Sequence, residues 1–416
     1  MDERRRHTWM VDRLLAQGRI LSPEVERAFR AVPRHLFLPG EAPSDAYRDR
    51  AVVTKWTEGS PVSSASQPSM VAIMLEQLAL RIGHRVLEIG TGTGYNAALM
   101  AQLVGPSGAV VSVDIDDDLV LSARGHLDAA GIAGVTLATR DGALGYSEGA
   151  PYDRIVLTVG SWDIQPAWWD QLAPGGRLLL PLSVRGSQLS VALDLVPGTP
   201  RRLRSESVRS CAFVRMRGQG ADPEGSHPLA ARGLTVHAVD ERALIGERVT
   251  ELLAEPGPER LSPVRLAAVD LWDGFGLWLA VREPGMCRLL VSAEASGWWP
   301  SLLPRGVDGG TVALLGEQGL AMIAPTGSTE VGMQDLFGVA VRGYGPAGAE
   351  LAGRLDGLLS SWAAAGRPTA AELLLRAYPP GSDPPDGPGV AVSKQHSQLL
   401  LDWPGNPIPP GPILVG

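Results

Sequence analysis

Short apolar runs alternate with longer amphipathic segments through the first half of the chain. The runs that predict buried strands lie at 86–89, 109–113, 135–138, 154–159 and 177–182. The stretches between them have the length and spacing of helices, as at 95–104. Strands that alternate with helices favour right-handed crossovers and a parallel sheet covered on both faces. The pattern therefore predicts an α/β fold, with a terminal hairpin made by 189–196 and 207–216.

Helices are predicted ahead of this sheet. Ser22 and Pro23 form a helix start, with Ser22 as the N-cap and Pro23 at the first helical position. A second helix, at 70–80, has its apolar side chains along one side. We therefore expect a first domain over residues 1–220, with N-terminal helices in 8–55 and a core in 56–220.

Beyond residue 220 the pattern changes, and the turn-rich stretch 218–233 is the best candidate for a domain boundary. The expected elements are hairpins at 267–281 (around Asp273 and Gly274), 311–323 and 390–403, an amphipathic helix that includes Leu351 and Trp362, and an extended tail at 404–416. They predict a C-terminal α+β domain over 221–416. Its tryptophans favour an aromatic core over a peptide-binding surface, although Trp298 and Trp299 cannot both point inward from a strand.

A glycine-rich turn follows the first predicted strand of the sheet. Gly90, Gly92 and Gly94 lead from the strand into the helix at 95–104. Glycines are needed where a Cβ would keep the backbone from approaching a ligand closely. The next apolar run ends at Asp114, where a carboxylate is suitably placed to bind two ribose hydroxyls. The combination predicts a nucleotide-type cofactor site.

The spacing of the turn discriminates between cofactors. A dinucleotide site is expected to have its third glycine one residue later, with a pyrophosphate at the helix N-terminus. Glu88, just before this turn, would repel a pyrophosphate but suits the ammonium and sulfonium groups of S-adenosylmethionine. Asp141, after the strand at 135–138, is placed to accept a hydrogen bond from an adenine amino group. The sequence therefore predicts a methyltransferase.

Composition narrows the classes of partner. The formal net charge of −8 argues against a nucleic-acid surface. Cys211 and Cys287 lie far apart, and the histidines show no ligand spacing, so neither a disulfide framework nor a metal site is predicted. Met1 to Arg6 has no apolar segment after it, and no apolar run reaches membrane-spanning length. We expect a cytoplasmic protein with no nucleic-acid or membrane partner.

Several motifs together resemble the protein-L-isoaspartate O-methyltransferase family. They are V-P-R-H-L-F at 32–37, S-Q-P at 66–68, the turn at 88–94, Asp141-Gly142 and L-x-P-G-G at 172–176. The resemblance covers about residues 10–217 and implies a Rossmann-like methyltransferase fold that binds S-adenosylmethionine and releases S-adenosylhomocysteine. The expected cofactor contacts are Glu88, Gly90, Thr91, Gly92, Gly94, Asp114, Ile115, Asp141, Gly142 and Thr158. The S-Q-P loop implies Ser66 and Gln67 at the reacting carboxylate, with Ser64, Pro68, Val159 and Gly160 beside the substrate.

The chain departs from that family in two places. Residues 48–64 replace the stretch that usually leads to S-Q-P, and about two hundred residues follow the methyltransferase segment. This extended layout is similar to that of homologues in lanthipeptide and graspetide biosynthesis, which methylate ordinary aspartate in a constrained ribosomal precursor peptide. We expect such a precursor as partner, and a methyl ester that cyclises to succinimide and hydrolyses to isoaspartate. The alternatives are an isoaspartyl repair methyltransferase and a non-catalytic, cofactor-binding adaptor.

Carboxylate methylation makes few demands on the site. A carboxylate is already ionised at neutral pH, so positioning and exclusion of water are sufficient without a catalytic acid–base pair. Ser66 and the backbone amides of its loop can hold the carboxylate by hydrogen bonds. The alternative is that Ser66 merely caps a helix starting at Ser69.

Overall fold

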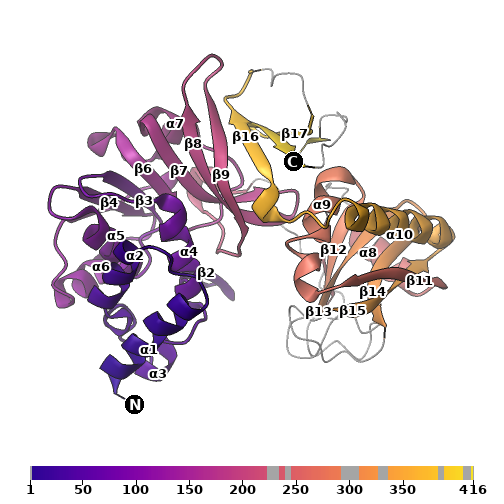
Figure 1. The fold of residues 1–416 in the computed structure, drawn as a ribbon, viewed down its shortest axis with the longest axis horizontal. Coiled ribbons are helices and arrows are strands. Elements are labelled where there is room, and N and C mark those ends of the chain that lie inside the picture. The colour runs from indigo at the N-terminus through magenta and orange to yellow at the C-terminus, as the bar shows by residue number, and fades with distance from the viewer. Residues whose placement is uncertain are drawn as a thin grey trace.

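The computed structural model describes residues 2–222, 234–238, 245–291, 309–326, 336–382, 388–405 and 414–415. Within these residues the strands form two large sheets and one small hairpin (Figure 1). The helices of the first half are α1 (Glu3–Ala16), α2 (Pro23–Ala31), α3 (Pro43–Ala46), α4 (Pro68–Leu78), α5 (Tyr95–Val104), α6 (Asp117–Ala129) and α7 (Pro166–Gln171). The hairpin consists of β1 (Val52–Thr57) and β2 (Ser60–Ala65), which pair antiparallel.

The first sheet follows the predicted alternation of strands and helices. Its first strands are β3 (Arg85–Ile89), β4 (Ala109–Asp114), β5 (Val135–Thr139), β6 (Tyr152–Leu157), β7 (Leu172–Val184), β8 (Ser187–Val196) and β9 (Arg202–Ser210). Strand β3 lies between β4 and β6, and the pairings from β5 across to β7 are parallel. Strands β8 and β9 add antiparallel. The α/β, Rossmann-like topology predicted from the sequence is confirmed.

Alternate residues of these strands face two separate cores. Val86 and Val110 belong to the core on the side of helices α1, α2, α4 and α5, whereas their neighbours Leu87 and Val111 belong to the opposite core. Both faces of a parallel sheet are covered in this way, which is why the strands are continuously apolar. The second core includes Trp168 of α7 and extends into the second half of the chain.

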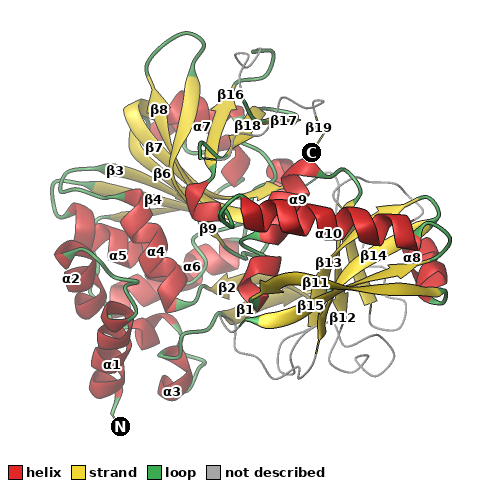
Figure 2. Ribbon diagram, turned by 45° about the vertical axis from the view of Figure 1, so that its right-hand side comes forward, coloured by secondary structure: helices red, strands yellow, loops and turns green. Residues whose placement is uncertain are grey.

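The second half forms an antiparallel sheet of its own. Its strands are β10 (Leu234–Ala238), β11 (Pro256–Leu266), β12 (Met286–Val291), β13 (Gly309–Gly316), β14 (Gly319–Thr326) and β15 (Phe337–Tyr344). Its helices are α8 (Ile245–Leu253), α9 (Phe275–Arg282) and α10 (Gly348–Ala364). Helix α10 lies across one face of this sheet (Figure 2) and buries Leu355, Leu359 and Trp362. The predicted amphipathic helix and the hairpin at 311–323 are confirmed.

After α10 the chain returns to the first sheet. Strand β16 (Leu374–Tyr378) pairs with β9. Across the sheet, the next strands are β18 (Gln398–Asp402), β17 (Val390–Ser393) and β19 (Leu414–Val415), in that order. Figure 1 shows these yellow strands beside β9, away from the orange second sheet. The hairpin expected at 390–403 is present, but it extends the first sheet. A division at residue 220 therefore does not separate the two sheets, and the domain assignment stays a prediction.

Two local predictions are wrong. The segment at 267–281, expected to be a hairpin, is a short 3-10 helix (Ala268–Leu271) followed by α9. Residues 275–281 are all buried, so this helix has no polar face that would have given a helical period in the sequence. The strand expected at 207–216 ends at Ser210. Trp298, Trp299, residues 223–233 and most of the tail lie outside the described residues.

Beyond β9, residues 211–220 leave the sheet and form what we call the crossing segment. Its Val214 and Met216 exchange backbone hydrogen bonds with Gly160, at 2.8 Å each. Gln188 of β8 holds Phe213 by accepting from its backbone N–H at 2.5 Å. The crossing segment consequently runs over the carboxyl ends of β6 and β3, where ligands bind in open α/β sheets.

Candidate cofactor and acceptor site

The glycine turn lies at the centre of the site. Gly90, Gly92 and Gly94 have φ values of 103°, 50° and 84°, a region that side chains with a Cβ rarely adopt. A Cβ at Gly90 would lie 2.5 Å from Thr158 Oγ1, and one at Gly94 would lie 3.2 Å from the Ala123 Cβ. A Cβ at Gly92 would meet no atom closer than 3.8 Å, because this glycine faces open space.

Two open cavities meet at this turn. One, of about 480 Å³, is lined by Arg34, Ser64, Ser66, Tyr95, Asn96, Phe213 and the backbone of 90–93. The other, of about 540 Å³, is lined by Ser63, Asp114, Ile115, Gly142, Val159 and residues 214–217. Gly90, Gly92, Ser64 and Thr158 line both. Both volumes include solvent at the open mouth, so the two cavities are parts of an open cleft.

Asp114 lies at the end of β4, on the second cavity, and is 9% exposed. Its carboxylate accepts backbone hydrogen bonds from Gly92 at 2.9 Å and from Asp116 at 3.2 Å. Burial raises the pKa of Asp114, and these two hydrogen bonds oppose that rise. A carboxylate can accept about four hydrogen bonds, so Asp114 holds the turn and still has acceptor capacity toward the cavity.

Glu88 lies behind the turn and lines neither cavity. The side chain is fully buried, and its oxygens accept hydrogen bonds from Asn96 at 2.8 Å and Ser112 at 2.5 Å. Burial raises the pKa of Glu88 to about 7. The expected direct contact with a sulfonium group has no support in this geometry, whereas Asn96, which Glu88 orients, does line the cavity.

Asp141 is also set back from the cavities. Its carboxylate accepts from the backbone N–H of Ala143 at 2.9 Å and from that of Gln219 at 2.8 Å. The hydrogen bond from Gln219 ties the crossing segment to the loop that follows β5. Asp141 therefore joins the strand end to the crossing segment, and its role as an acceptor for the adenine amino group stays a prediction.

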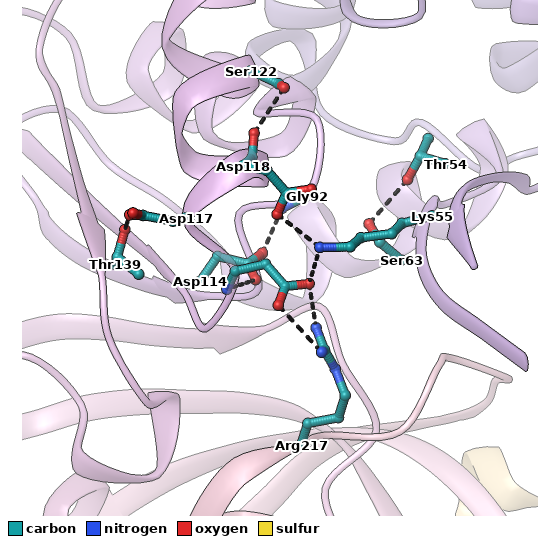
Figure 3. A network of polar contacts seen from close by, with 11 residues as sticks. Thr54, Lys55, Ser63, Gly92, Asp114, Asp117, Asp118, Ser122, Thr139 and Arg217 are labelled. Atoms are coloured by element: carbon teal, nitrogen blue, oxygen red, sulfur yellow. Dashed lines mark hydrogen bonds and ion pairs between the residues drawn. The ribbon is translucent and has the colours of Figure 1, made fainter. Parts of the chain in front are cut away.

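An ion-pair cluster, whose Arg217 lines the second cavity, joins the hairpin to the crossing segment (Figure 3). Lys55 of the β1–β2 hairpin contacts Asp116 at 2.9 Å and Asp118 at 2.7 Å. Arg217 of the crossing segment contacts Asp116 at 2.6 Å. Hydrogen bonds from Arg217 and Lys55 hold the pKa of Asp116 below its usual range. The segment at 48–64, which departs from the family pattern, is thereby anchored over the site.

The S-Q-P loop brings Ser66 to the first cavity, but Gln67 and Pro68 do not line it. Helix α4 begins at Pro68 with Gln67 as N-cap, and the Ser69 N–H donates to Asp49 at 2.9 Å. The alternative in which Ser66 caps this helix is therefore wrong. The Gln67 amide donates to the Ser69 hydroxyl at 2.6 Å.

The structure brings most of the predicted site residues together. Those on the cavities are Ser64, Ser66, Gly90, Thr91, Gly92, Asp114, Ile115, Gly142, Thr158 and Val159, and those set back are Gln67, Pro68, Glu88, Gly94, Asp141 and Gly160. Sequence reasoning missed Arg34, Lys55, Phe213 and Arg217. Only Arg34 had a signal, since it lies in the V-P-R-H-L-F motif. Lys55 and Arg217 approach the site only through tertiary structure.

The residues present fit S-adenosylmethionine. The open side of Gly92 admits close approach of a ligand that a Cβ would block, and Asp114 offers a charged acceptor for hydroxyl groups. No cluster of metal-ligating side chains occurs among the described residues. In the part of the chain that the structure describes, no helix is long and apolar enough to cross a membrane.

Curated relatives match about half of this chain, and one solved structure aligns with most of it. It is 40% identical over 205 residues to protein-L-isoaspartate O-methyltransferase 2 of Archaeoglobus fulgidus, covering 49% of this chain and 90% of the relative. It is 42% identical over 200 residues to the protein-L-isoaspartate O-methyltransferase of Methanothrix thermoacetophila, covering 48% and 90%. A solved protein-L-isoaspartate O-methyltransferase aligns with 89% of this chain and 96% of its own, at 26% identity and a TM-score of 0.48.

The family description agrees with these relatives. The model of the family protein-L-isoaspartate(D-aspartate) O-methyltransferase matches residues 5–219, which include the hairpin, the glycine turn, the residues that line both cavities and the crossing segment up to residue 219. Since this match spans more than half of the 416 residues, the chain belongs to the protein-L-isoaspartate O-methyltransferase family, and S-adenosylmethionine is its cofactor.

Proposed function

We propose that this protein transfers a methyl group from S-adenosylmethionine to the free carboxylate of an isoaspartyl residue in a protein or peptide. The observation that carries the proposal is the pair of cavities that meet at Gly90 and Gly92, with Asp114 on one and Ser66 on the other. One cavity can hold a nucleoside while the other admits a carboxylate to the same turn. The names of the family and of its relatives support isoaspartate over ordinary aspartate as acceptor.

The site needs to position its ligands and to keep water out. When bound, S-adenosylmethionine supplies a methyl group on a positively charged sulfur. An acceptor carboxylate oxygen forms the new bond to the methyl carbon as the carbon–sulfur bond breaks, so no proton has to move. We assign Asp114 to the ribose hydroxyls and Ser66 to the acceptor carboxylate. The β1–β2 hairpin and the crossing segment exclude water, which strengthens the interactions inside.

The second half of the chain is proposed to bind the peptide around the acceptor. Arg185 donates to the Ala280 carbonyl at 2.7 Å, and Arg288 donates to Gly186 and Ser187, so α9 and β12 contact the β7–β8 turn. Burial lowers the pKa of His237 in β10, and the positive charge of Arg215 in the crossing segment is the next largest cause. Strand β10 is therefore close to the segment that covers the cofactor side. A cytoplasmic site of action remains a prediction from the sequence.

Turnover on a matched peptide panel tests the proposal. Three peptides of one sequence are compared, a linear isoaspartyl form, a linear aspartyl form and a cyclised aspartyl form, and the gain of one methyl group is recorded by intact mass. We expect methylation of the isoaspartyl peptide. Methylation confined to the cyclised aspartyl peptide would overturn this acceptor.

Ser66→Ala tests where the acceptor binds. We expect a fall in kcat, with the affinity for S-adenosylhomocysteine nearly unchanged, because the Ser66 hydroxyl would contact only the acceptor. Ser69→Ala is the matched control, since Ser69 lies on the same helix start but not on either cavity. An equal loss of activity in both variants, with equal loss of thermal stability, would assign Ser66 to the architecture of the loop.

Methylation of aspartate in a ribosomal precursor peptide is the second candidate. It is favoured by the anchored hairpin, which brings Ser63 and Ser64 to the cavities in place of the stretch usual in the family, and by the added second sheet. A macrocycle would hold the aspartyl side chain in one conformer and lower the ordering cost of binding. The cyclised aspartyl peptide of the panel distinguishes this candidate from methylation of isoaspartate. Cofactor binding without methylation of any peptide would favour the non-catalytic adaptor.

A further inference from the structure

Arg34 is a buried cation on the first cavity. It begins the 3-10 helix η1 (Arg34–Phe37) and is 1% exposed. Its Nε donates to the Ala46 carbonyl at 2.9 Å and its Nη2 to the Ala65 carbonyl at 3.4 Å. Among the described residues, its Nη1 has no hydrogen-bond acceptor. The guanidinium is therefore held in place by neutral groups, with its Nη1 unused as a donor.

A second unused donor lies beside it. The hydroxyl of Tyr95, the first residue of α5, is buried and has no partner among the described residues. The Arg34 guanidinium carbon lies 5.2 Å from the centre of the Tyr95 ring. Phe29 and Phe37 pack edge-on against this ring, at 6.3 Å and 5.5 Å between centroids, so its orientation is fixed. Both donors belong to residues that line the cavity containing Ser66.

A buried guanidinium is stabilised best by an anion. Desolvation is the largest influence on the pKa of Arg34 and lowers it. The carboxylate that acts on it is Asp49, whose Oδ1 already accepts from the Ser69 N–H. Arginine presents several donors in a planar fork that matches a carboxylate, and buried charges in proteins are normally paired. A carboxylate entering the cavity would supply the missing charge and both missing acceptors.

We propose that Arg34 Nη1 and the Tyr95 hydroxyl form the receptor for a carboxylate in this cavity. The inference rests on the proposed function, which supplies two carboxylates here: the amino acid carboxylate of the cofactor and the acceptor carboxylate of the peptide. Both have the same chemistry, and ligands that differ in one of them distinguish the two sources. The V-P-R-H-L-F motif thereby acquires a binding role.

The competing explanation is that Arg34 only braces the fold. Its bonds to Ala46 and Ala65 join the segment before the hairpin to the S-Q-P loop. A brace would affect all ligands and the melting temperature together, whereas a carboxylate receptor discriminates between ligands. Arg288 provides a control for the two ligand measurements, because it is also buried, donates to Gly186 and Ser187, has an unpartnered Nε and lines neither cavity.

The test compares full-length wild type, Arg34→Met, Arg34→Lys, Tyr95→Phe and Arg288→Met by calorimetry and peptide kinetics. The ligands are S-adenosylhomocysteine and its decarboxylated analogue, and the substrate is the isoaspartyl peptide. If the cofactor carboxylate binds, Arg34→Met should weaken S-adenosylhomocysteine about tenfold or more but leave the decarboxylated analogue unchanged. If the acceptor carboxylate binds, both ligands keep their affinity and the KM of the peptide rises about tenfold. Arg34→Lys should retain part of either effect.

Other outcomes overturn the proposal. Equal weakening of both ligands, or no change in either ligand or in KM, assigns Arg34 to the architecture. The same discrimination between the two ligands in Arg288→Met does so as well. If both Arg34 variants fail to fold, Tyr95→Phe decides, since it keeps the ring packing and removes only the hydroxyl; an unchanged Tyr95→Phe protein then overturns the proposal. Absence of S-adenosylhomocysteine binding by the wild type would instead overturn the proposed function.

Discussion

At the scale of single residues, Glu88 behind the glycine turn makes the stability of the fold depend on pH. Burial raises its pKa from 4.5 to about 7, so protonation is favoured in the folded state. The stabilisation from this carboxyl is fully present below pH 4.5 and is lost as the pH rises through about 7. Glu88→Gln should remove this dependence and, at pH 8, raise the free energy of unfolding by at most roughly 3 kcal/mol.

Melting curves of the two proteins at pH 5 and pH 8 check this prediction. The gain in melting temperature from Glu88→Gln should be larger at pH 8. Glu255→Gln, at an exposed position, serves as control and should change neither curve appreciably. An equal gain at both pH values would show that Glu88 is not protonated near neutrality.

Asp114 holds the glycine turn and is proposed to bind the ribose, and a pair of variants separates these two roles. Asp114→Ala should weaken S-adenosylhomocysteine binding by about 1.5–3 kcal/mol, because it removes a charged acceptor and releases the Gly92 N–H. Asp114→Asn keeps an oxygen for Gly92 and loses only the charge, so its loss should be smaller. Calorimetry measures both. Wild-type affinity in Asp114→Ala would mean that the ribose is held elsewhere.

At the scale of elements, the β1–β2 hairpin depends on the cluster around Asp116. The Lys55 side chain is 27% exposed and that of Asp116 only 16%, so their contact is partly protected from solvent. Lys55→Met should increase amide hydrogen exchange across residues 52–65, and added salt should do the same to the wild type. Arg27→Met, in an exposed ion pair on α2, is the control. Unchanged exchange in the hairpin would mean that backbone pairing alone holds it.

At the scale of the whole molecule, the two halves are expected to be inseparable. A chain truncated after residue 220 loses β16, which pairs with β9, and the contact of Ser397 with buried Asp163 at 2.5 Å. It also loses Phe275 and Leu271 from a core shared with the first sheet. We expect aggregation or a large fall in melting temperature. A chain in which residue 222 is linked directly to residue 369 keeps β16–β18 and should melt at an intermediate temperature.

Gel filtration and circular dichroism rank the three proteins. A truncated chain that is monomeric and as stable as the internally linked one would show that the returning strands contribute little. Because neither shortened chain is expected to match the full protein, the role of the second half in peptide binding has to be tested by point variants.

The sequence predicted those features that local pattern determines. The order from β3 to β7, the turn at 90–94 and α10 each follow from periodicity, glycine spacing or an apolar stripe. The hairpin predicted at 267–281 was wrong because a fully buried helix has no hydrophobic periodicity that distinguishes it from a strand. The pairing of β16 with β9 and the burial of Arg34 depend on contacts between distant segments, which no local pattern records. The motif was enough to single out Arg34, but no sequence pattern could show that its Nη1 has no hydrogen-bond acceptor.

The return of the chain also sets an order of assembly during synthesis. The Leu375 N–H donates to the Ser205 hydroxyl at 2.9 Å across 170 residues of intervening chain. The growing chain therefore emerges with the β9 edge open and cannot close it until the entire second sheet has been made. An open edge of this kind is a template for pairing with other chains, and contacts of long sequence separation form slowly. The ribosome and its chaperones must protect that edge for as long as residues 211–373 take to be translated.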